Sequence, residues 1–359
     1  MTGQAGQNVP IGQIGQSGHE ATLMAPDRLA AAQAKAARVV SELRRVILGK
    51  DQMIDEVAAA LLARGHVLLE GLPGLGKTEL VKALSRLLSL DFRRIQFTPD
   101  LLPTDVTGSH ILQERDGRKE FAFHPGPVFT NVLLADEINR ASPKTQSALL
   151  EAMQEHRVTT FGETRPLPDP FFVLATQNPI ELEGTYPLPE AQLDRFMVKV
   201  EIAGVERAVL EEILLTRVHG EPPALEPVLT AGELRELFAV VDAVFLPRGV
   251  ASYIARLVAA SHPSCADAPE AVRTFVKHGA SPRAAIAIGA ISRGLALLRG
   301  KPHVGFDDVR RVAAPAMAHR LVLDYAARLE GWDGRRVVAA LLDAIPDVER
   351  GLPQTLEAR

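Results

Sequence analysis

The chain has 359 residues, of which 47% are hydrophobic and 23% are charged, as in a soluble globular protein with two domains. Its net charge of −4 lacks the basic excess typical of nucleic-acid binding. The single cysteine, Cys265, excludes an internal disulfide and a cysteine-built metal site, and it suits a reducing compartment. No apolar run approaches the ~20 residues of a membrane span, and the N-terminus has no signal-peptide pattern. We therefore expect a cytoplasmic protein.

Residues 1–25 are rich in Gly, Gln and Ser, which predicts a disordered tail. Helical patterns follow at residues 29–46 and 51–64. Apolar strand patterns then alternate with helical ones, which favours a parallel sheet covered by helices on both faces. The predicted strands are residues 66–70, 94–98, 132–135, 171–176 and 197–202, and the helices among them are residues 77–89, 142–155 and 205–216.

Two stretches break this alternation. Residues 99–130 form a long insertion rich in Pro and Gly, and residues 156–170 are typical of a hairpin that turns at Gly162-Glu163. Long insertions on a rigid α/β core usually carry function, so we expect both segments to contribute to it.

A proline-rich linker at residues 220–227 precedes a run of helical patterns. Thr230, Ser281 and Asp333 are suited to cap three of these helices. The chain should therefore divide into a tail at 1–25, an α/β core domain at 26–220 and an all-helical domain at 221–359. The predicted helices of the last domain are residues 231–245, 248–261, 268–278, 282–299, 306–320 and 334–344.

A phosphate-binding motif joins the first predicted strand to the next helix. Its sequence is Gly71-Leu72-Pro73-Gly74-Leu75-Gly76-Lys77-Thr78, which fits G-x-x-x-x-G-K-[ST]. The glycines let backbone N–H groups face the phosphates, and the helix N-terminus adds positive dipole. Lys77 would reach the β- and γ-phosphates, and Thr78 would hold Mg²⁺. The alternative is a glycine-rich turn with an idle lysine.

A second motif points to hydrolysis. The apolar run from Asn131 ends in Asp136 and Glu137, and ligands of parallel sheets lie beyond the carboxyl ends of such strands. Asp136 would bind Mg²⁺ through water, and Glu137 would orient and deprotonate the attacking water. The alternative is a surface acid pair that opens a helix.

Further motifs follow in a fixed order, and together the ensemble resembles the MoxR family of AAA+ ATPases over roughly residues 35–350. The resemblance rests on the phosphate loop and on the segments 94–105, 126–129, 135–141, 175–179, 189–196 and 279–284. It implies a P-loop NTPase core, a parallel sheet sandwiched by helices, followed by a helical lid domain. It also implies ATP and Mg²⁺ as ligands. The ten histidines form no metal-binding spacing, so no other metal is expected.

The resemblance assigns further roles. Asn178 would be the first sensor residue, orienting the lytic water or the γ-phosphate, although Asn-Pro also marks a turn. Arg195 would be the arginine finger, inserted into a neighbouring subunit's site; an ion pair with Asp194 or a nearby acid is the alternative. Arg140 is a rival for the finger, or a second interface arginine.

Arg283 would be the second sensor, reaching from the lid to the γ-phosphate of its own subunit, with a solvated arginine as the alternative. Residues 99–130 match the insert that the family's clade carries in the second core helix, and residues 156–170 match its hairpin before the first sensor strand. Gln96 is a candidate link between that insert and the nucleotide.

The implied activity is ATP hydrolysis by a homo-oligomeric ring, expected to be a hexamer. Its implied output is chaperone-like remodelling or maturation of a protein client, with a partner that bears a von Willebrand factor A domain on a separate chain. A nucleic-acid motor and a nucleotide-gated regulator with little turnover are the alternatives. The acidic balance of the chain argues against nucleic acid as a partner.

Overall fold

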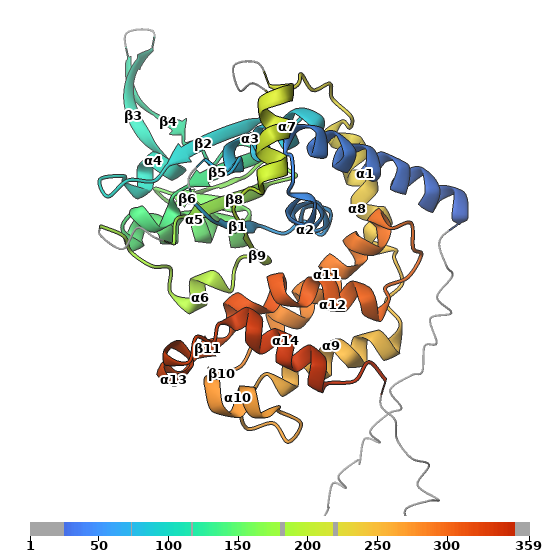
Figure 1. Ribbon diagram of the computed structural model, residues 1–359. Helices are drawn as coiled ribbons and strands as arrows, with labels where there is room; N and C mark the ends of the chain where they lie inside the picture. Colours follow the sequence, from blue (N-terminus) through green and yellow to red (C-terminus); the bar gives the residue numbers. More distant parts are fainter. Residues whose placement is uncertain (1–24, 73, 116–117, 180–183, 218–221, 349–359) are drawn as a thin grey trace, which may run out of the picture.

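The computed structural model describes residues 25–72, 74–115, 118–179, 184–217 and 222–348. At its centre lies a five-stranded sheet with the order β2-β5-β8-β1-β9, in which every pairing is parallel (Figure 1). This confirms the predicted parallel sheet. The strands are β1 (Val67–Glu70), β2 (Phe92–Gln96), β5 (Val132–Asp136), β8 (Phe172–Gln177) and β9 (Val198–Glu201).

Helices cover both faces of the sheet. Alternate residues of a strand point to opposite faces, so each strand contributes side chains to both. On β5, Leu134 joins the core beneath the N-terminal helices, whereas Leu133 joins a second core on the other face. The first face carries α1 (Pro26–Val46), α2 (Asp51–Leu62) and α3 (Lys77–Leu87), and the second carries α4 (Pro103–Thr107) and α5 (Pro143–Glu155).

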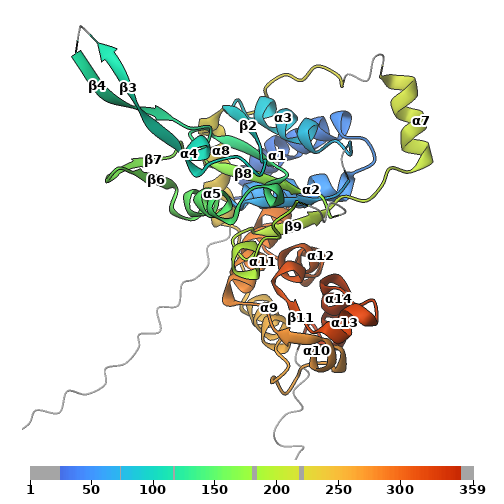
Figure 2. The same cartoon turned by 90° about the vertical axis from the view of Figure 1, so that its left-hand side faces the viewer.

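The two interrupting stretches both form antiparallel hairpins. The insertion contains α4 and the strands β3 (Gly108–Arg115) and β4 (Arg118–Pro125), which project from the body of the molecule (Figure 2). The second hairpin pairs β6 (Arg157–Thr160) with β7 (Glu163–Pro166). Its turn is Phe161-Gly162, one residue before the predicted position, and both residues have the positive φ of a two-residue hairpin turn.

The C-terminal part is helical, with one addition that periodicity did not predict. Residues 276–278 and 322–323 pair as a short antiparallel ribbon, so the expectation of an all-helical domain was wrong at this point. The three predicted caps, Thr230, Ser281 and Asp333, are confirmed by their hydrogen bonds. Its elements are α8 (Ala231–Asp242), α9 (Arg248–Ala260), α10 (Glu270–Phe275), β10 (Val276–His278), α11 (Pro282–Leu298), α12 (Phe306–Met317), β11 (Val322–Leu323), α13 (Tyr325–Leu329) and α14 (Gly334–Ala344). One further helix, α7 (Arg207–Thr216), precedes the linker.

The helical part packs closely on the α/β part. A Cβ at Gly294 of α11 would lie 2.6 Å from the Ala59 carbonyl oxygen of α2, so only glycine allows this approach. One hydrophobic cluster runs from Leu29 through the sheet to Ile345. The division at residues 220/221 therefore stays a prediction, and the tail at 1–25 falls, apart from Ala25, outside the described residues. No helix among the described ranges is long and apolar enough to cross a membrane.

Candidate active site

The phosphate loop runs from the carboxyl end of β1 into α3, the context that the motif requires. Gly74 and Gly76 have φ of 81° and 83°, in the left-handed region that favours glycine. Pro73 lies outside the described residues. The Nζ of Lys77 donates to the Gly71 carbonyl oxygen at 2.6 Å, so the loop already holds the lysine over its own backbone. Burial lowers the pKa of Lys77, and the nearby carboxylates of Asp136, Glu137 and Glu70 oppose that shift.

Asp136 is buried at the carboxyl end of β5, between two neighbouring strands. Thr176 of β8 donates its hydroxyl to Asp136 Oδ1 at 2.6 Å. Arg94 of β2 donates Nη2 to Oδ2 at 2.7 Å, and its Nε lies 3.1 Å from the same oxygen. Both oxygens are thus engaged by the protein, which agrees with a carboxylate that meets a cation through water.

Glu137 lies in a strained left-handed conformation, with φ of 56°, directly after β5. Its backbone N–H donates to the Thr176 hydroxyl at 2.9 Å. Its Oε2 accepts from Gln96 Nε2 at 2.7 Å and from Arg140 Nη1 at 2.9 Å. The rival finger candidate Arg140 is therefore paired with the glutamate of its own chain, and Gln96 contacts Glu137 directly.

Arg94 and Thr176 were missed by sequence reasoning. Arg94 lies two residues before Gln96, and β2 pairs with β5 so that Gln96 is opposite Asp136. That register depends on the strand order, which no local pattern contains. Asn178 was predicted, and it lies buried one residue beyond Gln177, which is paired with Glu70 at the start of the phosphate loop. The phosphate loop, Asp136, Glu137 and Asn178 thus share one edge of the sheet, which we call the carboxyl edge.

A pocket of about 680 Å³ adjoins the phosphate loop at this edge. It is large enough for a nucleotide-sized ligand. Gly71 and Leu72 line it beside Lys50 from the loop before α2, and the lid contributes Arg335, whose Nε lies 3.0 Å from Glu201 Oε2. The pocket is therefore shared by the α/β part and the helical part of the same chain.

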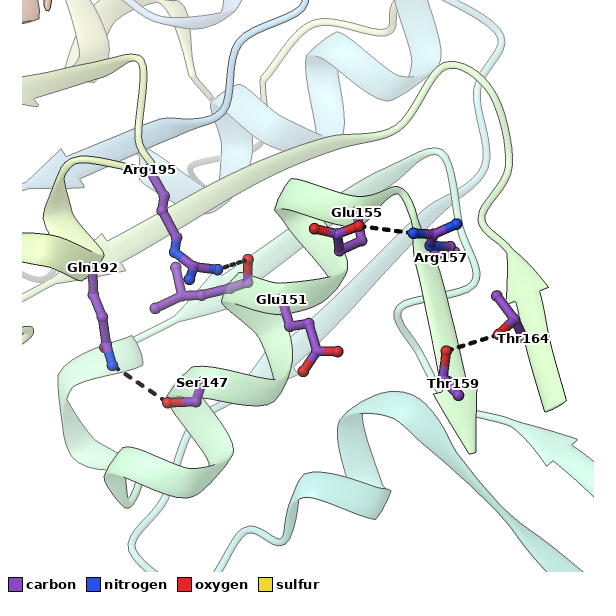
Figure 3. Close-up of a pocket in the computed structure, with 9 residues that line it drawn as sticks. Ser147, Glu151, Glu155, Arg157, Thr159, Thr164, Gln192 and Arg195 are labelled. Atoms are coloured by element: carbon purple, nitrogen blue, oxygen red, sulfur yellow. Dashed lines mark hydrogen bonds and ion pairs between the residues drawn. The ribbon is translucent and has the colours of Figure 1, made fainter. Parts of the chain in front are cut away.

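Arg195 lies at the other edge of the sheet. It follows α6 (Glu190–Leu193), and two residues later Met197 donates its backbone N–H to the His66 carbonyl oxygen, just before β9 and β1 begin. The Nη1 of Arg195 donates to the Leu150 carbonyl oxygen of α5 at 2.7 Å, in a polar pocket of about 650 Å³ (Figure 3). We call this side of the sheet the amino edge.

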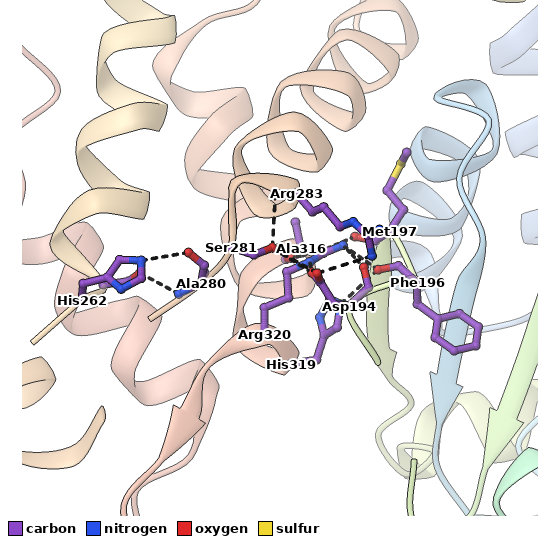
Figure 4. Close-up of polar contacts among 11 residues, drawn as sticks. Asp194, Phe196, Met197, His262, Ala280, Ser281, Arg283, Ala316, His319 and Arg320 are labelled. Atoms are coloured by element: carbon purple, nitrogen blue, oxygen red, sulfur yellow. Dashed lines mark hydrogen bonds and ion pairs between the residues drawn. The ribbon is translucent and has the colours of Figure 1, made fainter. Parts of the chain in front are cut away.

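Arg283 also lies at the amino edge. It opens α11, and its Nη1 is 3.6 Å from Asp194 Oδ2 (Figure 4). Arg195 and Arg283 line the same small pocket. α11 packs along α2, and its N-terminus lies beside residue 194, where Ser281 donates to Asp194. The expected reach of Arg283 to the γ-phosphate of its own subunit stays a prediction. The ion pair considered for Arg195 with Asp194 is replaced by pairs of Asp194 with Arg320 and Arg283.

Two buried histidines lie at the amino edge. Nε2 of His66 hydrogen-bonds to the Met153 carbonyl oxygen and its Nδ1 accepts from the Val173 N–H, while His319 Nε2 lies 3.1 Å from the Phe196 carbonyl oxygen. Burial lowers the pKa of His66 to about 4. Burial, helped by the charge of Arg320, lowers the pKa of His319 to about 3. Both rings are therefore neutral at pH 7.

Comparison with known proteins places this geometry in a family. Residues 66–198 match the ATPase family associated with various cellular activities (AAA), and residues 269–341 match the AAA lid domain. The chain is 41% identical to Chaperone MoxR1 of Mycobacterium tuberculosis, over 99% of this chain and 96% of that protein. It is 32% identical to Protein MoxR of Methylorubrum extorquens, over 90% and 95%. This protein belongs to the MoxR family of AAA+ ATPases.

A solved structure supports the same fold for this MoxR-family chain. The Cytophaga hutchinsonii protein, described as a candidate ATPase, superposes with a TM-score of 0.83 at 37% identity and covers 90% of this chain and 98% of its own. The family relationship implies nucleotide binding.

Mg²⁺ fits the oxygen donors at the carboxyl edge. Mg²⁺ in nucleotide sites takes one or two protein ligands together with phosphates and waters. Thr78 in the first turn of α3 and the carboxylate of Asp136 are hard oxygen donors of this kind. Within the part of the chain that the structure describes, no cluster of three His, Cys, Asp or Glu side chains could hold a metal by itself.

Proposed function

We propose that this MoxR-family protein hydrolyses ATP between subunits of a ring. The observation that carries the proposal is the placement of its charged groups: Lys77, Asp136 and Glu137 at the carboxyl edge, and Arg195 at the amino edge. Lys77 would pair with the β- and γ-phosphates. Thr78 and, through water, Asp136 would hold Mg²⁺, whose charge offsets that of the phosphates.

Glu137 would act as the general base. Its Oε2 is fixed by Gln96 and Arg140, and its backbone is fixed by Thr176, so the carboxylate is held at the strand end beside the phosphate loop. It takes a proton from the attacking water, which the nearby amide of Asn178 orients. Fixing a base before the substrate arrives lowers the reorganisation needed during the reaction.

Arg195 would serve the site of a neighbouring subunit. The strands between the two edges have four residues or more, which is ~13 Å of chain, so an arginine that emerges at the amino edge points away from its own phosphate loop. Arg140, paired with its own Glu137, is placed for a role within its own site. We assign Arg283 to the neighbour's site as well, because it lies beside Arg195.

The ring contact would include α7. Its leucines Leu210, Leu214 and Leu215 are 50%, 82% and 80% exposed, and no residue of this helix is buried. The helix starts next to Gly204 and Glu206, which line the pocket at the phosphate loop. A second copy of this chain that brings Arg195 to that pocket would cover the exposed leucines, which favours a ring of identical subunits; we expect six.

The output would be remodelling of a protein client. One relative carries the name Chaperone MoxR1. The two hairpins present Phe121 and Phe161, which are 73% and 83% exposed, and Phe161 contacts His110 of the other hairpin. We assign these exposed phenylalanines to contact with an unfolded segment. A partner with a von Willebrand factor A domain would be a separate chain.

Mixed rings test the proposal. Arg195→Ala keeps Glu137 in its own ATP site but cannot supply an arginine finger. Glu137→Gln supplies the arginine finger but lacks the general base. Each variant alone should be nearly inactive, and subunit exchange between them should restore ATPase activity. Co-assembly must be shown by two differently labelled subunits in one particle. Proven co-assembly without recovery would refute a finger acting in trans at residue 195, and recovery with Arg140→Ala in its place would transfer the role to Arg140.

A further inference from the structure

The segment that carries Arg195, residues 194–197, is held by the lid through one buried arginine. Arg320 follows α12, and its side chain is 3% exposed. Its Nε donates to Asp194 Oδ1 at 2.7 Å, and its Nη2 donates to the carbonyl oxygens of Asp194 and Phe196 at 3.1 and 2.8 Å. Its Nη1 donates to the carbonyl oxygen of Met197 at 3.1 Å and to that of Ala316.

These contacts use the whole hydrogen-bonding capacity of the side chain. A guanidinium has five N–H donors, and Arg320 has five acceptors, four of them on residues 194–197 (Figure 4). Lysine could retain the charge opposite Asp194, but its three donors lack the planar geometry that reaches several carbonyls at once.

Other lid residues reinforce the same segment. The hydroxyl of Ser281 lies 3.1 Å from both carboxylate oxygens of Asp194, and His319 Nε2 lies 3.1 Å from the Phe196 carbonyl oxygen. The side chain of Arg195, in contrast, extends toward α5 and contacts the Leu150 carbonyl oxygen (Figure 3). The lid therefore holds the backbone on both sides of Arg195 and leaves its guanidinium directed elsewhere.

We propose that Arg320 is a positioning residue for Arg195, so that the lid of one subunit sets the finger geometry at the next subunit's ATP site. This inference rests on the proposed trans role of Arg195. Because backbone atoms on both sides of the finger are bonded to Arg320, displacement of the lid moves the finger as well. A catalytic arginine must be placed to within a fraction of an ångström to stabilise developing charge, so loosening the segment lowers the rate.

The experiment adds Arg320→Lys to one or the other of the two kinds of subunit in the mixed ring. The parent mixture is Arg195→Ala with Glu137→Gln, in which the second subunit donates the finger. Arg320→Lys on that donor should lower the restored ATPase activity about tenfold. Arg320→Lys on the Arg195→Ala subunit, whose finger is already absent, should leave activity within about twofold of the parent.

If Arg320 only holds the lid to the core, Arg320→Lys would lower the restored ATPase activity equally on either subunit. That result would overturn the inference. Absence of activity in the parent mixture would instead refute the trans finger, and the inference with it. Thermal unfolding and ATP affinity of Arg320→Lys alone report its folding. If that variant does not fold, Ser281→Ala should show the same asymmetry more weakly, and symmetric losses there count equally against the inference. Arg328→Lys, an exposed lid substitution, is the matched control and should change neither mixture.

Discussion

The two edges of the central sheet use charge in different ways. At the carboxyl edge, the two acids at the end of β5 are fixed by side chains of the neighbouring strands: Thr176 and Arg94 hold Asp136, and Gln96 holds Glu137. At the amino edge, Arg195 is placed by contacts of its backbone neighbours with the lid, chiefly through Arg320. The first arrangement gathers the groups that we propose bind and activate ATP within one subunit. Under the proposed role of Arg195, a complete catalytic site would need two copies of the chain.

The largest expected effects belong to the carboxyl edge. Lys77→Ala should abolish ATP binding, because the phosphate charge then has no partner in the loop. Glu137→Gln should keep ATP binding and lower turnover about 10³-fold, since the amide preserves shape but cannot take a proton. Equilibrium nucleotide binding and steady-state ATPase assays separate the two, and Glu330→Gln, an exposed lid variant, serves as the control. Near-normal turnover by Glu137→Gln would remove it as the base.

Arg195→Ala should give the next largest effect. It tests whether the amino edge contributes to turnover while the carboxyl edge alone binds ATP. We expect the ATP affinity to stay within about twofold of wild type and the turnover to fall ~10²-fold, because a finger acts on charge that develops in the transition state. Wild-type specific activity should also rise with protein concentration as rings assemble, whereas that of Arg195→Ala should stay low throughout. An ATPase rate of wild type that is independent of concentration, measured across the assembly range, would contradict a site built from two subunits.

The assembly itself should depend on α7. Leu214→Glu places a charge on the exposed apolar face and should raise the concentration for half-assembly about thirtyfold, the amount that corresponds to one buried leucine. Glu212→Ala on the same helix is the matched control. Sedimentation with bound ATP measures both variants. Unchanged assembly of Leu214→Glu would remove α7 from the subunit contact.

The same contrast separates what the sequence could predict from what it could not. The carboxyl edge was predictable because a phosphate loop and an apolar strand that ends in two acids are local patterns, and parallel strands bring such ends together. The parallel sheet and most helices were predicted for the same reason, since burial on one or both faces leaves a periodic pattern.

Contacts between distant segments were not predictable in this way. Arg94 and Asp136 are 42 residues apart, and Arg320 and Asp194 are 126 apart, so only the folded chain brings each pair together. The position of Arg283 was not predictable either, because its motif locates the residue on a helix start but not the position of that helix against the sheet. The β10–β11 ribbon has five residues, too few for a periodic signal.

The smallest expected effect concerns pH and tests whether the amino edge is held by neutral histidines. His66 and His319 have pKa values lowered to about 4 and about 3, against about 6.5 for an unfolded histidine. A lowered pKa means that the unfolded chain takes up protons that the folded chain does not. The stability that these two neutral histidines contribute is therefore fully present above pH 6.5. It is lost as the pH falls from 6.5 toward 4 and 3. Between pH 7.5 and 5.5, each histidine should lower the free energy of unfolding by about 1.4 kcal/mol.

His319→Gln should make that pH dependence shallower by about 1.4 kcal/mol over the same interval, even though the substitution itself lowers stability. The variant must be compared with wild type because burial raises the pKa of Glu56. That shift changes the free energy of unfolding with pH in the opposite direction, and it is the same in both proteins, so it cancels when their pH dependences are subtracted. Denaturant unfolding at fixed protein concentration measures both proteins. An equal slope for wild type and His319→Gln would show that His319 has the same pKa in the folded and unfolded chain, and the lowered pKa of this buried ring would then be refuted.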